Sequence, residues 1–587
     1  MSAKATWSIV LVAAGCLVQP EAQAAERWVG QRASGRLAFY SRVLDAIGAR
    51  LTPASQPDAD DRLSAAFEAV GRLEFDAPGS IFRDVREGSL RLSSRARLRG
   101  AGGTLALDGL TLRRGVDERT LELLGPDGQV WFEADHMHFE SDRKRGRFRM
   151  YNLDVRLTPA TARLLGDVHY AELAVAVMEM EVPLPELVGA VEQPLGGCTT
   201  PNWGAPHNDV ALINISSVQQ MARDATPPAR IAIAPSATLK NVGTTDVPWF
   251  SKFSGVFAPY NNDQHPFLVW GFYRLAGGAI EQVGVSPLKH AFVSTNSNCG
   301  CSGGNILWVG CEDTYGTGTN DGANSLGVRK EIHPYLGIWE RCGSIFDTNC
   351  DGVANSAPRA TTMERRMAVF ESDLQTAGAT YYIDSWYVVR DDVNIFNTMG
   401  WRVATPVAPT PPSTQWTFSL GAALTQGRVL DQWVNPAAPG PNADSVPVDT
   451  PFGKLRLAVK ATSLGGGQWR YEYALMNYDF EPRVKSLRIP LPAGATPSNI
   501  GFHDPDADGA TDWAASTAGG AITWTAPNSA ASQDWHTLYN FRFTVNASPS
   551  AVSGVQAQLG VDAARGWAPA VSVMGPGTTT FQQTERE

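Results

Sequence analysis

The feature that most constrains the fold of this chain is a pair of apolar runs on either side of Gly277-Gly278. Residues 264–275 and 279–290 are rich in β-branched and aromatic side chains, and a Gly-Gly pair between two such runs predicts a β-hairpin with a two-residue turn. Continuing the register away from the turn predicts the facing pairs Arg274–Glu281, Phe272–Val283, Trp270–Val285 and His265–His290.

This register places His265 and His290 opposite each other, with their Cβ atoms roughly 5 Å apart. Pro287 cannot donate to a ladder and predicts a sheet edge or bulge nearby, and a one-residue slip would move the two imidazoles to opposite faces. Three interpretations stay open: two hydrogen-bonded histidines at the rim of a sheet, a metal-free acid/base pair, or a transition-metal site for zinc, copper or iron.

A transition metal held by two histidines would need a further protein ligand. Asp313, Glu331 and His333 are the candidates, because they follow a loop-rich stretch that can fold back over the hairpin. Distance along the sequence does not choose among them. The aromatic stretch 381–389 is expected to be a strand that either packs in the core or lines a groove for a flat ligand.

The cysteines indicate an oxidising compartment. Beyond Cys16, six remain, and six cysteines in an exported chain predict three disulfides of undetermined connectivity. A zinc cluster is the alternative, but the spacing lacks the paired C-x₂-C of structural zinc sites. The six residues are Cys198, Cys299, Cys301, Cys311, Cys342 and Cys350.

The first 24 residues have the pattern of a Sec-type signal peptide. Lys4 precedes an apolar run over residues 7–18, and Ala22-Gln23-Ala24 offers a cleavage site. The mature chain is therefore expected in the periplasm or outside the cell. A lipoprotein anchor at Cys16 is the less favoured alternative, because the usual Leu three residues earlier is absent. No later run is long enough to predict a transmembrane helix.

A chain of 587 residues is too long for one core and predicts about three domains. Alternating strand patterns and abundant turn residues predict a mainly β, multidomain protein. We expect an antiparallel β-rich domain over 25–195, a central His/Cys-rich β domain over 196–403 and a Pro-rich linker over 404–414. A β-sandwich of immunoglobulin or fibronectin type should span 415–575, followed by a flexible tail over 576–587.

The C-terminal domain carries the most specific ion motif. Asp504, Asp506, Asp508 and Asp512 occupy positions 1, 3, 5 and 9 of a loop, with the Ala510 carbonyl at position 7. Carboxylates this close repel one another without a cation, so the spacing predicts a calcium site. Position 12 is not Glu, which favours a dockerin-like or surface calcium loop over an EF-hand, and an acidic turn without an ion is the alternative.

A second stretch repeats this spacing with weaker ligands. Asp347, Asn349 and Asp351 alternate before Gly352, as the acids of the first loop alternate before their glycine. Cys350 lies inside the stretch, so a disulfide is an alternative reason for its loop composition.

Several motifs together resemble a group of large secreted bacterial proteins that are abundant in planctomycetes. The motifs cover about residues 240–550, and no activity comes with the resemblance, which implies only export and a separate C-terminal module. The chain departs from the group at Pro287, where those proteins tend to have Trp. The motifs are 264–266, 273–275, 281–284, 288–292, 310–315, 498–504 and 535–543.

Composition limits the function classes. A formal charge of −10 and the lack of a basic stripe argue against nucleic-acid binding. The sequence therefore predicts an exported, calcium-stabilised multidomain β protein that binds a polymer or a cell-surface partner at the surface or in the matrix. The alternative is a secreted metalloenzyme, a hydrolase or an oxidoreductase, with its metal on His265 and His290.

Overall fold

The computed structural model describes residues 25–53, 56–58, 61–76, 84–115, 120–135, 138–142, 147–183, 186–191, 198–203, 208–255, 258–260, 263–551, 554–561 and 569–577. The predicted signal peptide and most of the predicted tail lie outside these residues. The protein is mainly β, with 50% strand and 7% helix, and multidomain, as predicted. Within the described residues, no helix is long and apolar enough to cross a membrane.

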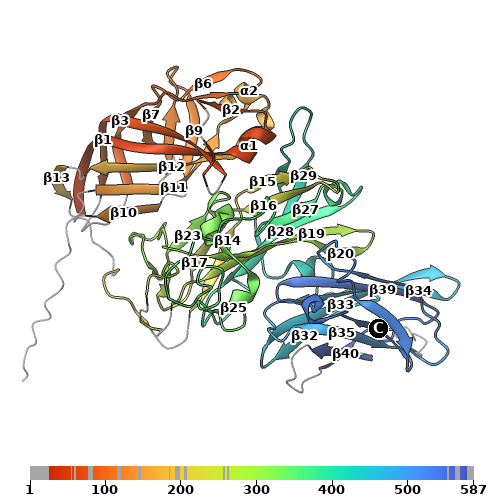
Figure 1. Cartoon of the computed structure of the whole chain (residues 1–587). Helices are drawn as coiled ribbons and strands as arrows, with labels where there is room; N and C mark the ends of the chain where they lie inside the picture. The colour runs from red at the N-terminus through yellow and green to blue at the C-terminus, as the bar shows by residue number, and fades with distance from the viewer. Residues whose placement is uncertain are drawn as a thin grey trace, which may run out of the picture.

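The N-terminal unit is one large antiparallel sheet that closes on itself, because β9 pairs with β11 (Figure 1). In order across the sheet, the strands are β10 (His138–Asp142), β11 (Arg147–Leu157), β12 (Ala174–Pro183), β1 (Ala25–Tyr40), β3 (Arg62–Asp76), β4 (Asp84–Ser93), β7 (Thr111–Arg114), β8 (Leu121–Leu124) and β9 (Val130–Asp135). A further strand, β13 (Glu186–Val191), pairs with the first residues of β1.

Short elements complete this unit. Helix α2 (Pro159–Leu165) begins where the Thr158 side chain accepts a hydrogen bond from the Thr161 N–H, with Pro at the first helical position. Helix α1 (Ser41–Ala46) follows β1. A small sheet is formed by β2 (Arg50–Thr52), β5 (Arg97–Arg99) and β6 (Thr104–Ala106).

The predicted hairpin is present in the central unit as β19 (Phe267–Ala276) and β20 (Ala279–Val285). Gly277 and Gly278 both have positive φ, 61° and 91°, the conformation that a two-residue hairpin turn requires and that glycine adopts without strain. Arg274 faces Glu281 as predicted, and their side chains form an ion pair with 2.6 Å between Nη2 and Oε2.

The register of this hairpin shifts by one residue beyond Tyr273, at a bulge that leaves Val283 without a partner in β19. Two predicted pairs are therefore wrong. Ser286 and Pro287 then interrupt the strand, and the Ser286 hydroxyl accepts the Trp270 N–H at 2.8 Å where the ladder is broken. The observed pairs are Tyr273–Gln282, Phe272–Gly284 and Gly271–Val285, in place of Phe272–Val283 and Trp270–Val285.

Strand β19 lies at the centre of the largest sheet of the central unit. The strands in order are β24 (Leu326–Gly327), β21 (Leu288–His290), β19, β28 (Thr380–Val388), β29 (Met399–Val407) and β30 (Thr417–Leu420). Leu268, Trp270 and Phe272 pack in a core that this unit shares with the N-terminal sheet. Phe267 and Val269 point to the other face, into a core shared with the C-terminal unit. Residues 267–273 of this strand carry no charged side chain, because both faces of the strand are buried there.

The central unit also contains three smaller sheets, besides the two-stranded sheet of β25 (Ile332–His333) and β26 (Ile338–Trp339). Their strands, sheet by sheet, are β14 (Val210–Asn214), β17 (Ala237–Asn241) and β23 (Glu312–Tyr315); β15 (Val218–Asp224), β16 (Arg230–Pro235) and β27 (Met367–Phe370); and β18 (Val247–Pro248) and β22 (Ile306–Leu307).

The Pro-rich stretch differs from the extended connector that the sequence predicted. Residues 404–407 lie in β29 and pair with β30, so the prolines that follow sit in the turn of a hairpin. The Thr414 N–H donates to the Ala46 carbonyl at 2.8 Å, which holds this turn against the N-terminal unit. A strand that finds a ladder partner is favoured over an extended linker in water, because its backbone groups are then paired.

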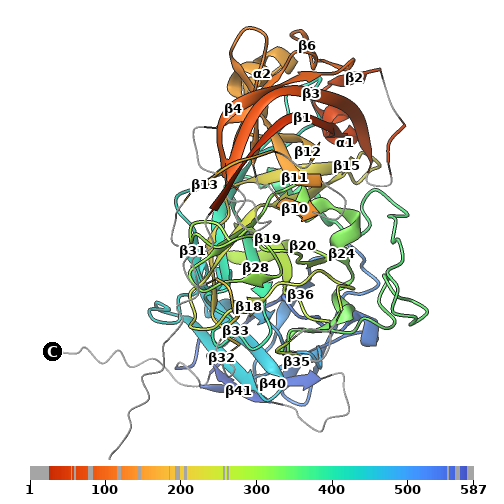
Figure 2. The ribbon, with the colours of Figure 1, turned by 90° about the vertical axis from the view of Figure 1, so that its left-hand side faces the viewer.

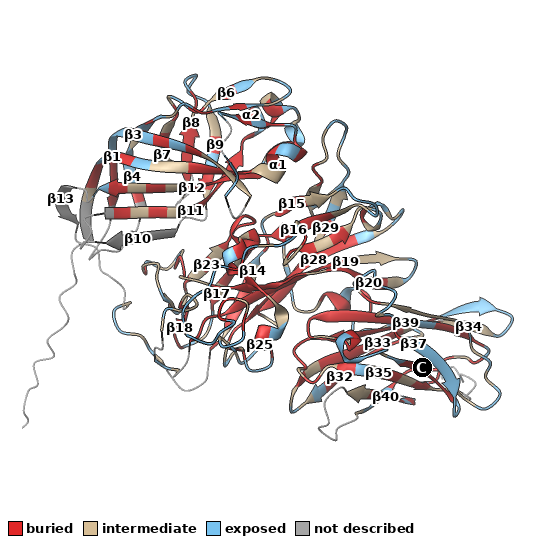
Figure 3. Ribbon diagram, viewed as in Figure 1, coloured by how far each residue is buried: buried red, intermediate tan, exposed pale blue. Residues whose placement is uncertain are grey.

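The C-terminal unit consists of two five-stranded antiparallel sheets around one apolar core (Figures 1 and 3). The first contains β32 (Ala443–Thr450), β33 (Gly453–Gly465), β34 (Gln468–Asn477), β39 (Thr537–Val545) and β36 (Ser498–His503). The second contains β37 (Ala514–Ala518), β38 (Ala521–Thr525), β35 (Val484–Pro490), β40 (Val555–Val561) and β41 (Ala570–Val573). The immunoglobulin or fibronectin assignment stays a prediction.

The central and C-terminal units are joined by buried polar contacts. Asp384 of β28 accepts hydrogen bonds from the Gly271 N–H at 2.6 Å and from the Tyr273 hydroxyl at 3.0 Å. Its Oδ2 also lies 3.1 Å from His536 Nε2, just before β39. Gln282 accepts the Leu538 N–H at 2.8 Å. A buried network whose members satisfy one another fixes the relative position of the two units.

Candidate functional site

His265 and His290 meet in the interior of the central unit, where they are 0% and 1% exposed. His265 precedes β19, and His290 ends β21 with Phe267 as its facing residue. The two histidines are therefore diagonal neighbours, where directly facing positions were predicted. Their rings still approach, with 5.0 Å between centroids and 2.7 Å between His265 Nε2 and His290 Nδ1. This distance is that of a hydrogen bond.

Glu331 extends this pair to a chain of three side chains. It ends the short 3₁₀ helix η5 (Arg329–Glu331), and its Oε2 lies 3.2 Å from His290 Nε2. Its other oxygen accepts the Ile345 N–H at 2.8 Å. A Cβ at Gly327 would lie 2.5 Å from Glu331 Oε2, so glycine leaves the space for this contact. We call His265, His290 and Glu331 the His–Glu chain.

Aromatic rings exclude water from the His–Glu chain. Trp339 presents an edge to both imidazoles, with centroids 5.2 Å away in each case. Phe267 and Phe346 are edge-on to His290 at 5.5 and 5.4 Å. Inside such an enclosure, a polar atom without a hydrogen bond destabilises the folded state. The hydrogen bonds among the three side chains therefore fix their orientations.

Burial controls protonation in the His–Glu chain. It lowers the pKa of both histidines well below the usual value, and the positive charges of Lys252 and Lys289 act in the same direction. Burial raises the pKa of Glu331, against the hydrogen bonds it accepts. A neutral imidazole has one donor and one acceptor, so an ionised Glu331 orients both rings: His290 donates to Glu331 and accepts from His265.

This orientation leaves His265 Nδ1 as an acceptor, and that buried atom has no hydrogen-bond partner. The 2.7 Å between His265 Nε2 and His290 Nδ1 is shorter than the separation of about 3.3 Å for two nitrogens bound to one tetrahedral zinc. Within the described part of the chain, the single trio of metal-binding atoms within 4.8 Å of one another is Cys299, Cys301 and Cys311. The His–Glu chain is thus arranged as a hydrogen-bonded relay.

The other two predicted third ligands lie elsewhere. Asp313 Oδ1 accepts the Thr295 N–H at 2.8 Å, and burial raises the pKa of Asp313 to about 6. His333 contacts Glu340 at 2.7 Å through Nε2 and Glu481 at 3.1 Å through Nδ1. Of the three candidates, only Glu331 contacts the histidine pair.

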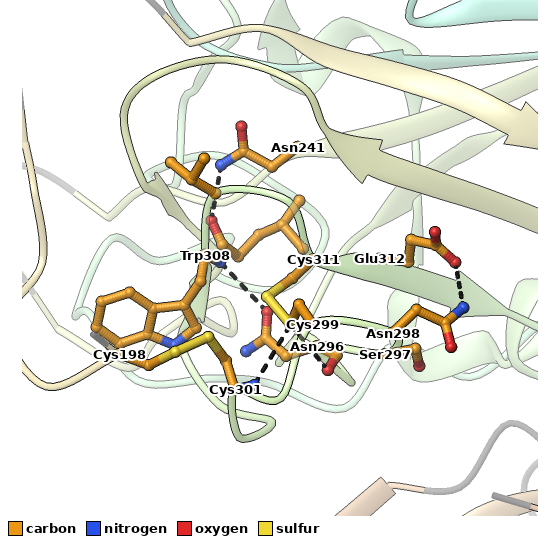
Figure 4. Close-up of a disulfide and its surroundings, with 12 residues drawn as sticks. Cys198, Asn241, Asn296, Ser297, Asn298, Cys299, Cys301, Trp308, Cys311 and Glu312 are labelled. Carbon is orange, nitrogen blue, oxygen red and sulfur yellow. Dashed lines mark hydrogen bonds between the residues drawn. A yellow bond between two sulfur atoms is a disulfide. The ribbon is translucent and has the colours of Figure 1, made fainter. Parts of the chain in front are cut away.

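All six predicted cysteines are paired, which confirms three disulfides. The bonds join Cys198–Cys301, Cys299–Cys311 and Cys342–Cys350. The first two lie side by side, and the Cys301 N–H contacts Cys299 Sγ at 3.5 Å (Figure 4). The adjacent Asn296 donates to the Ser302 and Ile306 carbonyls, the latter at 2.8 Å, which closes the loop. These bonds fix the Gly/Asn/Ser-rich stretch that has little regular structure of its own.

The loop of the weaker predicted calcium site is closed by contacts within the protein. Asp347 is 1% exposed, and its Oδ2 accepts the Gly352 N–H at 3.2 Å and lies 3.7 Å from Arg341 Nε. Asn349 donates to Asp351 at 2.8 Å. The third disulfide closes the same loop. The guanidinium supplies positive charge beside this carboxylate, whose Oδ1 is buried without a hydrogen-bond partner, and the weaker calcium site stays a prediction.

The acid loop, which carries Asp504, Asp506, Asp508 and Asp512, connects β36 of the first C-terminal sheet to β37 of the second. Three of its four carboxylates accept a backbone N–H from two residues ahead: Asp506 N–H donates to Asp504 at 3.2 Å, Asp508 N–H to Asp506 at 2.7 Å and Ala510 N–H to Asp508 at 3.0 Å. These successive Asx turns wind residues 504–510 into a compact loop. The order of carboxylates along this turn matches the first positions of a calcium loop.

Asp504 is the residue of this loop that has a buried carboxylate oxygen without a hydrogen-bond partner. It is 2% exposed, and its Oδ2 has no hydrogen-bond partner. Burial raises its pKa to about 7, and Asp506, Asp512 and Asp508 act in the same direction. A buried carboxylate oxygen among three further acids fits a hard cation such as calcium.

Lysines near the His–Glu chain were missed at the sequence level. Lys289 is 0% exposed, and its Nζ lies 3.9 Å from the Tyr315 ring centroid. Lys252 is partly buried, and its Nζ lies 4.4 Å from the Phe346 centroid. The signal available was a lysine inside an apolar or aromatic run, as in Trp249-Phe250-Ser251-Lys252-Phe253.

No family model matches the chain, and no curated protein is similar to it. The resemblance to secreted planctomycete-type proteins therefore stays a prediction, and function rests on the geometry of the sites.

Proposed function

We propose that this protein is an exported, calcium-stabilised binding protein that recognises a polymer or a cell-surface partner at the cell surface or in the matrix. The observation that carries the proposal is the orphaned, buried Oδ2 of Asp504 within the acid loop. A calcium ion there would neutralise the acids whose charges raise the Asp504 pKa. The ligands would be Asp504, Asp506, Asp508, Asp512 and the Ala510 carbonyl.

The position of the acid loop supports a binding role. Asp506 and Asp508 line a cavity of about 590 Å³ between the central and C-terminal units. Arg230, Arg366 and Tyr539 line the same cavity, which therefore combines charged, polar and aromatic groups. Cavities of this size and lining are typical ligand sites. A cation in the loop would fix one wall of this cavity.

The test is thermal unfolding with and without calcium. Added Ca²⁺ should raise the melting temperature, because it binds only where the acids are held together. Asp508→Ala should abolish the shift. Asp449→Ala is the matched control, since Asp449 is an exposed acid of the same unit that pairs with Lys454 at 3.1 Å. An equal calcium shift in Asp508→Ala would remove the loop from the proposal.

The alternative function, a secreted metalloenzyme, is favoured by one observation. His265 Nδ1 is buried without a partner, and a zinc, copper or iron ion would satisfy it. Both nitrogens of His290 are already engaged, by His265 and Glu331, so this ion would lack the second histidine. The discriminating measurement is the metal content of the purified chain after calcium is chelated. One transition-metal ion per chain would favour the enzyme.

A further inference from the structure

The N-terminal sheet lies against the central unit (Figure 2). Residues of both units line a second cavity of about 530 Å³. We call it the junction cavity. Strands β1, β3, β11 and β12 supply one wall, and the loop around Lys252 with residues 290–292 and 319–325 supplies the other. It is separate from the acid loop and touches the His–Glu chain only through His290.

Lys252 is the residue of this cavity that lacks an anionic partner. Within the described residues, no Asp or Glu oxygen lies within 4.0 Å of its Nζ, which donates to the Asn324 carbonyl and sits over Phe346. Burial lowers its pKa to about 8, against the attraction of Glu331. An ammonium taken partly out of water with no carboxylate partner is stabilised by an anion that enters beside it.

The other charges of the cavity leave a positive balance. Arg36 and Arg62 line it together with Lys252, and the acids there are Asp58 and Glu179. Glu179 is held by Arg36 and by Arg149, each at 3.2 Å, and Asp58 accepts the Arg62 N–H at 2.9 Å. The acids are thus occupied by neighbouring donors, while Lys252 is not paired with them.

The remaining lining fits a sugar. Ser251, Thr319 and Ser325 bring hydroxyl groups, and those of Thr319 and Ser325 donate to backbone carbonyls and keep their acceptor capacity. Tyr151 and Phe292 bring aromatic rings, each with a cation over one face. Hydroxyl groups exchange hydrogen bonds with sugar hydroxyls, and aromatic faces pack on the apolar faces of sugar rings. A cavity that combines these groups with an unpaired ammonium is complementary to a sugar that carries a negative group.

We propose that the junction cavity binds an acidic saccharide, with its carboxylate or sulfate group on Lys252. The inference rests on the proposed binding function and names its ligand class. The bound anion would form a charge-assisted hydrogen bond with the ammonium of Lys252, and such a bond is stronger than one between neutral groups. Arg36 and Arg62 add longer-range attraction that salt weakens.

The test is calorimetric titration of the full mature chain with three oligosaccharides of equal length: an oligogalacturonide, a sulfated galactan fragment and a neutral galactan fragment. We expect one acidic ligand to bind and the neutral one to bind at least about 10-fold more weakly. The tighter acidic ligand identifies the group, carboxylate or sulfate.

Lys252→Met should weaken acidic-ligand binding by about 10- to 100-fold, and Lys252→Arg should restore most of it. Lys330→Met is the matched control, because Lys330 is an exposed lysine of the same unit, and it should change binding less than about 2-fold. Unchanged melting temperatures show that the variants fold.

Equal binding by Lys252→Met, or equal binding of the neutral sugar, would overturn the inference and leave the binding function standing. Failure of both acidic ligands to bind would also overturn it. The calcium-dependent melting shift is measured separately, so loss of that shift with saccharide binding intact would count against the calcium proposal alone.

Discussion

The central and C-terminal units each gather ionisable side chains, and they deal with the charge in opposite ways. In the His–Glu chain both contacts pair a donor with an acceptor, the histidines are neutral, and the atom left without a partner, His265 Nδ1, carries no charge. In the acid loop four carboxylates of one sign lie together, and Asp504 Oδ2 has no partner. Complementary groups satisfy one another, whereas groups of like charge require a ligand from outside. The acid loop is therefore the better ion site.

The largest expected difference between the units comes from reduction. The Cys198–Cys301 bond spans 103 residues, and losing it should cost about 4 to 5 kcal/mol on a chain-entropy basis. The C-terminal sheets contain no cysteine and should keep their protection. Hydrogen exchange measured by mass spectrometry, with and without reductant, checks this. Equal loss of protection over residues 443–573 would show that the units do not differ in this way.

Removing an imidazole tests whether the side chains of the His–Glu chain stabilise one another through their hydrogen bonds. His290→Ala should destabilise the central unit by about 3 to 5 kcal/mol, because it leaves a cavity and two buried polar partners unpaired. His333→Ala, whose side chain is 32% exposed, should cost less than about 1 kcal/mol and is the control. Denaturant unfolding provides the measurement.

The double variant sharpens this result. His265→Ala with His290→Ala should cost clearly less than the sum of the two single changes, because the second truncation removes an atom already left unpaired. Additive costs would mean that the two imidazoles do not act together.

Calcium should stabilise the C-terminal unit, which contains the acid loop. At a concentration 100 times its Kd, Ca²⁺ should stabilise the C-terminal unit by about 2.7 kcal/mol. Asp504→Asn should raise the stability of the calcium-free protein, because it removes one charge from the cluster, and should also reduce the calcium response. Calorimetric scans with chelator and with Ca²⁺ measure both effects. A fall in calcium-free stability in this variant would contradict the repulsion argument.

Per pH unit, the smallest expected effect is a pair of opposite slopes of stability against pH, each at most about 1.4 kcal/mol per pH unit for one group. Folding lowers the pKa of His265 and His290, so their stabilisation is present above about pH 6.5 and is lost as the pH falls. Folding raises the pKa of Asp504 to about 7, so its stabilisation in calcium-free protein is present below about pH 4 and is lost as the pH rises to 7.

Unfolding monitored unit by unit between pH 4 and pH 7 measures these slopes. Saturating calcium should remove the slope of the C-terminal unit and leave that of the central unit. If stability changed with pH in the same direction in both units without calcium, the contrast between the His–Glu chain and the acid loop would be wrong.

Much of the local structure could be predicted because it depends on neighbours in the sequence. The turn at Gly277-Gly278 follows from the backbone freedom of glycine. Strand β11 and helix α2 arise from local signals, the alternation of side chains in the strand and an N-cap followed by proline in the helix. The Asx turns of the acid loop also arise within nine residues.

The candidate site was only partly predictable. The sequence indicated that His265 and His290 would meet, yet the bulge at Val283 and the break at Pro287 made them diagonal neighbours. Glu331 was one of three candidate partners, and Lys252 was missed. Each outcome depends on how segments far apart in the chain pack together.

By itself, the sequence determined the mainly β character, the hairpin turn, the number of disulfides and the acid loop, because these follow from short-range conformational preferences and charge spacing. The tertiary structure decided which cysteines pair, which acid reaches His290, which carboxylate oxygen is buried without a partner and where the cavities lie. Those properties depend on burial and on contacts between segments that are far apart in the sequence. Such contacts form only when the whole chain packs, so local sequence patterns do not predict them.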